Sequence, residues 1–247
     1  MADLTLKSSL AQGIQAAFSH AGVRIEFDHP IRNSPKLFAL KSRELGVRTV
    51  LDVGANFGQF ARDLRKHRYS GTIVSFEPLS VAHAALTQSA AADAQWRIAP
   101  RMALGSANAQ TTINISKNLA SSSLLPVQNR SVEAAAVTAY TGQESVDVRR
   151  LDDVVDATCE EPLALKLDTQ GFELQVLEGA ERTLQRTALV LSEMSLASLY
   201  ENGAAFSDVY EFLERSGFRC ISLIQGFADN ARHELLQVDG VFVRDRR

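Results

Sequence analysis

The chain has 247 residues, of which 45% are hydrophobic and 22% are charged, and its formal net charge at pH 7 is −3. This length and composition are typical of one large α/β domain with a short extension. The negative charge provides no overall positive field for nucleic acid, and two cysteines, Cys159 and Cys220, are too few for a disulfide framework.

The first 45 residues are expected to form a helical segment in front of the main domain, which then covers residues 46–247. Apolar residues at helical spacing predict a helix over residues 4–21, and a second helical run covers residues 36–45. The N-terminus lacks the unbroken apolar core of a secretory signal, and no stretch approaches the roughly 20 apolar residues that cross a bilayer. We therefore expect a cytoplasmic protein that does not bind membranes; the sequence does not indicate its oligomeric state.

From Val47 onward, short apolar runs alternate with amphipathic segments. This order implies parallel strands joined by right-handed crossovers, and the last two strands, with no helix between them, predict an antiparallel end to the sheet. The sequence thus predicts an α/β fold with a doubly wound, seven-stranded, mostly parallel sheet and one antiparallel strand. The expected strands are residues 47–54, 71–78, part of 97–106, 111–116 (as an edge strand), 145–150, 162–171, 188–195, 218–224 and 234–244, the expected helices are 56–67, 80–92, 172–184 and 206–216, and 121–126 is expected to be a loop.

The sharpest local feature is the turn between the first predicted strand and its helix. It contains Gly54 and Gly58, so a ligand can approach bare backbone near the positive end of the helix. Glu77 lies 19 residues after Gly58, at the end of the second strand, where an acid accepts hydrogen bonds from the two hydroxyls of a ribose. The turn and the acid together indicate a site for an adenosyl nucleotide.

Two side chains in this turn distinguish between adenosyl ligands. Asn56 occupies the middle position, where dinucleotide sites need glycine so that pyrophosphate can lie against the backbone. Asp52 precedes the first glycine, where an anion repels a diphosphate but favours an ammonium and a sulfonium. Both departures favour S-adenosylmethionine over NAD(P), and a turn that binds no ligand is the remaining alternative.

A second constellation of polar residues follows the predicted strand at residues 162–171. Lys166, Asp168 and Gln170 alternate along this strand, so they share one side of it and emerge at the rim where open α/β sheets bind ligands. Glu193 ends a neighbouring strand at the same rim. Lys166 is either catalytic or paired internally with Glu193 or Glu173.

The chain resembles the FkbM family of methyltransferases in several motifs spread over residues 47–244. These are VLDVGANFG, FEP, the ALG that ends at Gly105, the LDD that begins at Leu151 and, most distinctively, LKLDTQGFELQVLEGA. The resemblance implies a class I methyltransferase (Rossmann-like) fold and S-adenosylmethionine-dependent O-methylation of a natural product, sugar or polysaccharide. The chain departs from the family pattern after Glu193, where many relatives carry a histidine, so no histidine base is assigned there.

The predicted function is therefore methyl transfer from S-adenosylmethionine to a hydroxyl of a small molecule or sugar; the alternatives are an NAD(P) oxidoreductase and a non-catalytic module that binds an adenosyl ligand.

Asp168 is either the base that takes the hydroxyl proton or a ligand of the cofactor, and Glu193 is a second catalytic candidate. A further interpretation of these two carboxylates is a divalent cation site, for which no third ligand is evident. Ser121, Ser122 and Ser123 are either contacts of cofactor or acceptor or ordinary loop residues. The predicted cofactor-binding residues are Asp52, Gly54, Ala55, Asn56, Gly58, Glu77, Pro78, Met102, Ala103, Asp168 and Gln170.

Overall fold

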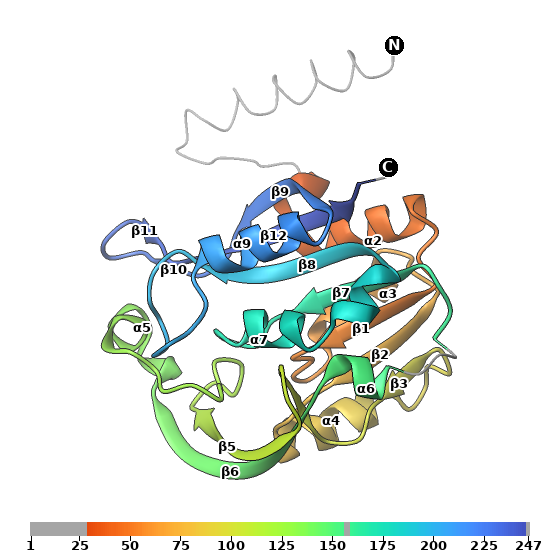
Figure 1. Cartoon of the computed structure of the whole chain (residues 1–247). Helices are drawn as coiled ribbons and strands as arrows, with labels where there is room; N and C mark the ends of the chain where they lie inside the picture. The colour runs from red at the N-terminus through yellow and green to blue at the C-terminus, as the bar shows by residue number, and fades with distance from the viewer. Residues whose placement is uncertain (1–28, 156–158, 246–247) are drawn as a thin grey trace, which may run out of the picture.

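The computed structural model describes residues 29–155 and 159–245, which are built around one seven-stranded sheet (Figure 1). The first five strands of the sheet run parallel, and β12 runs antiparallel to both of its neighbours. The predicted mostly parallel sheet with one antiparallel strand is confirmed. The strand order is β3 (Trp96–Ile98), β2 (Thr72–Phe76), β1 (Thr49–Val53), β7 (Leu163–Leu167), β8 (Thr187–Ser195), β12 (Gln237–Arg244) and β9 (Phe218–Gln225).

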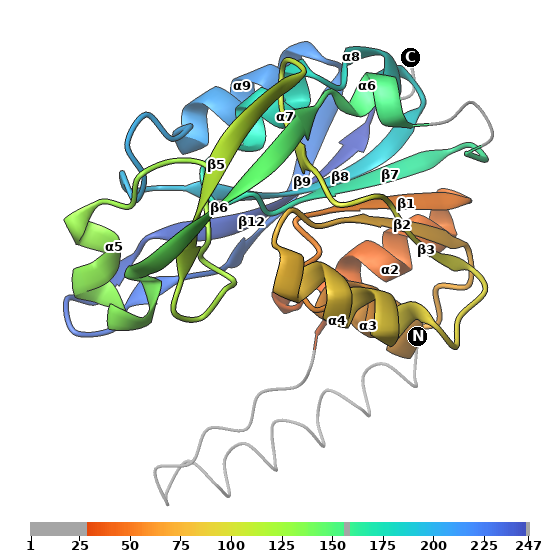
Figure 2. The same ribbon diagram turned by 90° about the horizontal axis from the view of Figure 1, so that it is seen from below.

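Helices cover both faces of this sheet (Figure 2). Every residue of β1 and β7 is buried, as expected for central strands that are covered on both sides. The two faces carry separate apolar clusters, one centred on side chains such as Phe38 and Leu64 and the other on side chains such as Leu177 and Phe242. One layer contains α2 (Ser34–Glu44), α3 (Gln59–Lys66) and α4 (Ser80–Ala90), and the other contains α6 (Leu151–Val154), α7 (Glu173–Glu178), α8 (Glu181–Gln185) and α9 (Phe206–Arg215).

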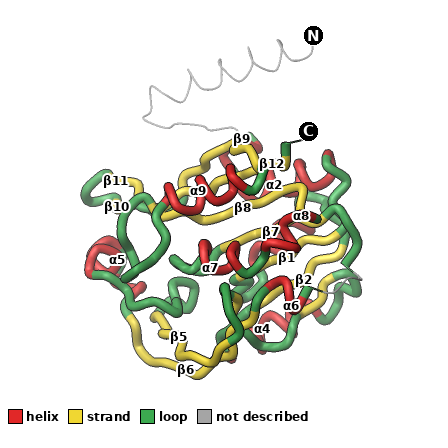
Figure 3. The backbone as a smooth tube through the Cα atoms, in the orientation of Figure 1, coloured by secondary structure: helices red, strands yellow, loops and turns green. Residues whose placement is uncertain are grey.

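A second, three-stranded sheet lies beside the main one, and the sequence did not predict it (Figure 3). The predicted strand within residues 97–106 is two strands, because Pro100 cannot donate a backbone hydrogen bond and the chain leaves the main sheet there. The strand predicted at 111–116 does form an edge strand, but it belongs to this smaller sheet and not to the main one. Its strand order is β4 (Ala103–Leu104), β6 (Tyr140–Arg149) and β5 (Ala109–Ser116), and β5 and β6 are joined through α5 (Asn129–Ala134) and a 3-10 turn, η2 (Ala136–Thr138).

The helix predicted over residues 172–184 is broken into α7 and α8 at Gly179. A Cβ added at Gly179 would lie 2.0 Å from the carbonyl oxygen of Gly105. The break therefore allows the smaller sheet's backbone to approach the helical layer closely, which a continuous helix with a side chain at this position would prevent.

The N-terminal prediction is only partly within the described residues. The helix expected at 4–21 lies outside them, whereas the second run is α2, preceded by a short turn, η1 (Pro30–Arg32). Asn33 caps α2 by accepting a hydrogen bond from the Lys36 backbone at 2.9 Å. The division into 1–45 and 46–247 stays a prediction. None of the described helices is long and apolar enough to span a membrane. A short hairpin, β10 (Ala228–Asp229) and β11 (Glu234–Leu235), precedes β12.

Candidate active site

A cavity of about 320 Å³ opens at the carboxyl ends of the central strands β1, β2 and β7. The strand order reverses between β1 and β7, and open α/β sheets bind ligands at such a switch point. The volume is at the lower end of the range for small-molecule sites. Most of the predicted site residues line the cavity: Gly54, Ala55, Asn56, Glu77, Pro78, Met102, Ala103, Asp168 and Gln170. Three predicted residues do not line it: Asp52, Gly58 and Glu193.

The glycine turn after β1 forms the cavity floor. Gly54 has a φ of +74°, and a Cβ added there would lie 1.9 Å from the carbonyl oxygen of Asp168. Gly58, at a φ of +79°, serves packing instead, because a Cβ there would lie 2.5 Å from the Trp96 ring. The first glycine thus brings the ends of β1 and β7 together, and the second seats α3 against the sheet.

Replacing Gly54 with alanine should destabilise the protein more than the same change at Gly46. Both glycines have left-handed backbones, for which a Cβ costs roughly 1–2 kcal/mol, but nothing lies within 4 Å of a Cβ added at Gly46. The difference between the two variants in urea unfolding therefore isolates the clash with Asp168. Equal losses of unfolding free energy would show that the close approach of β1 and β7 is not needed.

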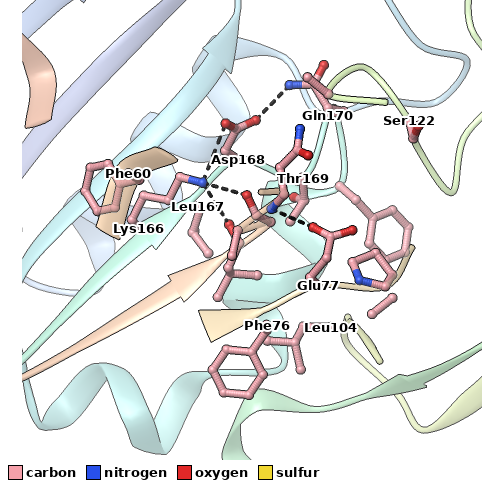
Figure 4. Close-up of a pocket in the computed structure, with 18 of the residues that line it drawn as sticks. Phe60, Phe76, Glu77, Leu104, Ser122, Lys166, Leu167, Asp168, Thr169 and Gln170 are labelled. Carbon is pink, nitrogen blue, oxygen red and sulfur yellow. Dashed lines mark hydrogen bonds and ion pairs between the residues drawn. The ribbon is translucent and has the colours of Figure 1, made fainter. Parts of the chain in front are cut away.

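Glu77 is a buried acid, 4% exposed, that faces the cavity from the end of β2 (Figure 4). Its two carboxylate oxygens accept hydrogen bonds from the backbone N–H groups of Asn56 at 2.7 Å and Leu79 at 2.9 Å. Burial raises the pKa of Glu77 to about 7, although these two bonds oppose the shift. Each oxygen keeps a lone pair, which suits the predicted ribose hydroxyls.

Replacing Glu77 with alanine should weaken S-adenosylmethionine binding by about 1–3 kcal/mol, the cost of losing a hydrogen bond to a charged acceptor. Donors from a ribose stabilise the ionised carboxylate, so binding releases a proton whenever Glu77 is protonated in the free protein. Calorimetry should therefore show affinity falling as the pH drops below about 7. A Glu77→Gln variant should not show this slope, and an equal slope in both proteins would remove Glu77 from the ribose site.

Lys166 occupies the centre of the site as a buried cation. Its Nζ donates to the Gly54 carbonyl at 2.8 Å and lies 3.4 Å from Asp52 and 3.5 Å from Asp168. Burial opposes its charge, but the charges of Asp168 and Asp52 outweigh burial and raise the pKa of Lys166. The prediction that Lys166 pairs with Glu193 or Glu173 is wrong: the strand register sets it opposite Asp52.

Asp52 lies behind the cavity wall. It is fully buried, accepts a hydrogen bond from the Ser75 hydroxyl at 3.1 Å and directs its charge at Lys166. Glu173 is also committed within the protein, because it accepts hydrogen bonds from the backbone of Thr169 and Gly171. Both acids thus stabilise the residues around the site and do not face the ligand.

Asp168 and Glu193 are linked at the rim by Gln170. The Gln170 amide donates to Asp168 at 2.7 Å and to Glu193 at 2.8 Å. Asp168 faces the cavity, whereas Glu193 lies outside its lining and accepts a second hydrogen bond from Gln237 at 2.6 Å. Burial raises the pKa of Glu193 well above its ordinary value. Among the described residues, no group of three or more His, Cys, Asp or Glu side chains is arranged to hold a metal ion.

Three further residues around this rim were missed or left open by the sequence. Tyr200 donates its hydroxyl to Gln170, Gln237 donates to Glu193, and Ser123 donates to the Gln170 carbonyl at 2.7 Å. Only the serine tract was noticed in the sequence, as an unassigned loop. Tyr200 and Gln237 lie in segments without a recognisable motif, so only the fold reveals them.

The cavity suits an adenosyl ligand with a cationic tail. Glu77 presents acceptors, and the buried Asn56 Oδ1 has no hydrogen-bond partner among the described residues. Donors of a ligand can satisfy both, and the Asp168 carboxylate faces the same space. Residues 52–220, more than half of the chain, match the model of the Methyltransferase FkbM domain.

The chain belongs to the FkbM methyltransferase family.

Solved structures with the same fold include magnesium protoporphyrin IX methyltransferase from Synechocystis PCC 6803, with bound S-adenosylmethionine. It is 8% identical, with a TM-score of 0.50, and the match covers 95% of this FkbM methyltransferase and 96% of that chain. A TehB-like S-adenosylmethionine-dependent methyltransferase from Corynebacterium glutamicum is 13% identical, with a TM-score of 0.42, over 98% and 100% of the two chains. No curated protein is similar enough in sequence to count as a relative.

The fold is thus that of a class I methyltransferase, and the family uses S-adenosylmethionine. Membership decides against NAD(P) as the cofactor of this FkbM methyltransferase. The predicted cofactor-binding residues that line the cavity lie in the glycine turn, at the end of β2, at β4 and after β7.

Proposed function

We propose that this FkbM methyltransferase methylates a hydroxyl group of a small molecule or sugar, with Asp168 as the base. The observation that carries the proposal is the position of the Asp168 carboxylate: it faces the cavity beside the glycine turn, and its side chain is 39% exposed. A hydroxyl is a poor nucleophile until its proton is taken, so O-methylation benefits from a carboxylate at this point.

When bound, S-adenosylmethionine supplies an electrophilic methyl group on a sulfonium. The sulfur is the leaving group, and it needs no protonation to leave. The cavity walls orient the acceptor hydroxyl toward that methyl group, an effect worth roughly 7–11 kcal/mol for well-aligned reactants. Asp168 would accept the hydroxyl proton as the acceptor oxygen gains the methyl group, and the bound S-adenosylmethionine would supply the leaving sulfur, which would keep the carbon–sulfur bonding pair. Because Asp168 is partly exposed, it can release this proton to water.

The cavity wall beyond Asp168 supports an acceptor with both polar and apolar surface. Ser122, Ser123 and Thr169 contribute hydroxyl groups, and Leu119 and Leu124 contribute apolar surface from the same loop region. The Ser123 and Thr169 hydroxyls donate within the protein, to the Gln170 carbonyl and to Glu173, so their oxygens serve as acceptors for the hydroxyls of a polyhydroxy acceptor. With a net charge of −3, the protein has no overall attraction for nucleic acid, so we take the acceptor to be a small molecule.

The test is to follow a ¹³C-labelled methyl group from S-adenosylmethionine to a panel of methyl glycosides and to the matching amino glycosides. We expect methyl ethers, identified by the chemical shift of the labelled carbon. Methyl transfer to nitrogen alone would contradict the hydroxyl as acceptor. Cofactor binding without transfer to any member of the panel would favour the non-catalytic alternative.

A further inference from the structure

We propose that Gln170 is a positioning residue, which fixes the Asp168 carboxylate and connects it to Tyr200 and to the insertion, residues 103–149, that carries the smaller sheet. The inference rests on the proposed role of Asp168. The sequence predicts that Gln170 binds the cofactor directly, whereas the geometry points to an action through Asp168.

The first argument is the hydrogen bonding of the Gln170 amide. An amide nitrogen has two hydrogens, and here one is directed to Asp168 and the other to Glu193. The amide oxygen accepts the Tyr200 hydroxyl at 2.6 Å. Neither hydrogen is left for a cofactor or an acceptor, although the side chain lines the cavity.

The second argument is the way in which the Asp168 carboxylate is held from two sides. Oδ1 accepts from Gln170 at 2.7 Å, and Oδ2 lies 3.5 Å from the Lys166 ammonium. A hydrogen bond on one oxygen and an ion pair on the other fix the rotation of the carboxylate, which a single contact would leave free. The plane of the carboxylate, and hence the direction of its remaining lone pairs, depends on Gln170.

The third argument is that the turn carrying Gln170 is itself fixed. Gln170 has a left-handed backbone, with a φ of +55°, and Gly171 follows at +95°. The buried Glu173 carboxylate accepts the Gly171 N–H at 3.0 Å, and Tyr200 packs so closely that a Cβ added at Gly171 would lie 3.0 Å from its ring. A non-glycine residue in this conformation persists only where its surroundings over-determine it.

The fourth argument is the connection to the insertion. The buried Ser123 hydroxyl donates to the Gln170 carbonyl at 2.7 Å, and the neighbouring Ser122 lines the cavity. Burial raises the pKa of Tyr200, so its hydroxyl remains a donor to Gln170. Gln170 therefore joins the loop that faces the acceptor to the carboxylate at the reacting end.

The experiment is a double-mutant cycle between Gln170→Ala and Asp168→Asn, combined with a crystal structure of Gln170→Ala. Gln170→Ala removes the hydrogen bonds to Asp168 and Glu193 and the acceptor of the Tyr200 hydroxyl. The loss of the bond to Asp168 should slow transfer to a methyl glycoside about 10- to 100-fold. Residues that act as one unit are not additive, so in the Asp168→Asn background the same change should have little further effect. The crystal structure should show the Asp168 carboxylate rotated, and calorimetry should show S-adenosylmethionine affinity close to that of the wild type.

The proposal is overturned if the two changes are additive, if Asp168 keeps its orientation without Gln170, or if Gln170→Ala weakens cofactor binding while Asp168 stays in place. Tyr200→Phe is a milder variant that removes one hydroxyl, and it should slow transfer less than Gln170→Ala does. Gln95→Ala is the matched control, because this exposed amide accepts a hydrogen bond from Thr72 at the start of β2, at the opposite end of the strand from the cavity. If the wild type methylates only nitrogen, the hydroxyl proposal fails, but the crystal structure and the binding data still decide the role of Gln170.

Discussion

Replacing Asp168 with asparagine should slow methyl transfer about 10²- to 10⁴-fold, the range that a positioned base contributes. The two side chains have the same shape, but asparagine cannot accept a proton at neutral pH. It also has one acceptor oxygen and no charge, whereas the wild-type carboxylate accepts from Gln170 with one oxygen and forms an ion pair with Lys166 through the other. We expect a lower kcat, with a dissociation constant for S-adenosylmethionine close to that of the wild type.

The measurements that check this result are steady-state kinetics with a methyl glycoside and calorimetry with S-adenosylmethionine. Equal losses in binding and turnover would make Asp168 a cofactor ligand, and an unchanged kcat would exclude it as the base. Asp147→Asn is the control, because Asp147 lies at the surface, where it makes an ion pair with Arg149 at 3.6 Å. Urea unfolding of Asp168→Asn separates a loss of chemistry from a loss of fold.

The sequence was sufficient for the parts of the site that depend on local order along the chain. Gly54 and Glu77 were predicted at the ends of adjacent strands, and both line the cavity. A buried strand, a tight turn and a helix specify each other over a few residues, so their relative positions follow from spacing alone. The same holds for Asp168 and Gln170, which share one strand end.

The partners of Lys166 could not be predicted, because they depend on strand register. Asp52 and Lys166 are separated by more than a hundred residues, and they meet because β1 and β7 pair with Asp52 directly opposite Lys166. A shift of one residue would turn the side chains to the opposite face. The sequence pattern predicted the strands that carry both residues, but it did not predict how the two strands pair.

The smaller sheet was missed for a related reason. Its strands are short or largely exposed to solvent, and they pair across a segment that includes irregular structure. The close approach of Gly179 to Gly105, which breaks the predicted helix, is likewise a contact between distant segments. Hydrophobic periodicity predicts one element at a time, so it does not predict contacts between elements.

Replacing Lys166 with methionine should destabilise the protein by about 3–5 kcal/mol, because it leaves the fully buried Asp52 without a cation. Methionine fills much of the lysine volume beside the Phe60 ring, so the effect is one of charge more than of packing. Urea unfolding at neutral pH measures the change. Lys41→Met provides the control, because Lys41 makes a surface ion pair with Glu44, and such pairs contribute about 0–1 kcal/mol.

A double variant, Asp52→Asn with Lys166→Met, decides whether the buried charge is the cause. Removing both charges should restore part of the stability that Lys166→Met loses, since the unpaired carboxylate is then absent. If the double variant is instead as unstable as the sum of the two single variants, the role of Lys166 is to hold the carbonyls of Val53 and Gly54. In that case the lysine stabilises the glycine turn directly, and its ion pair with Asp52 contributes little.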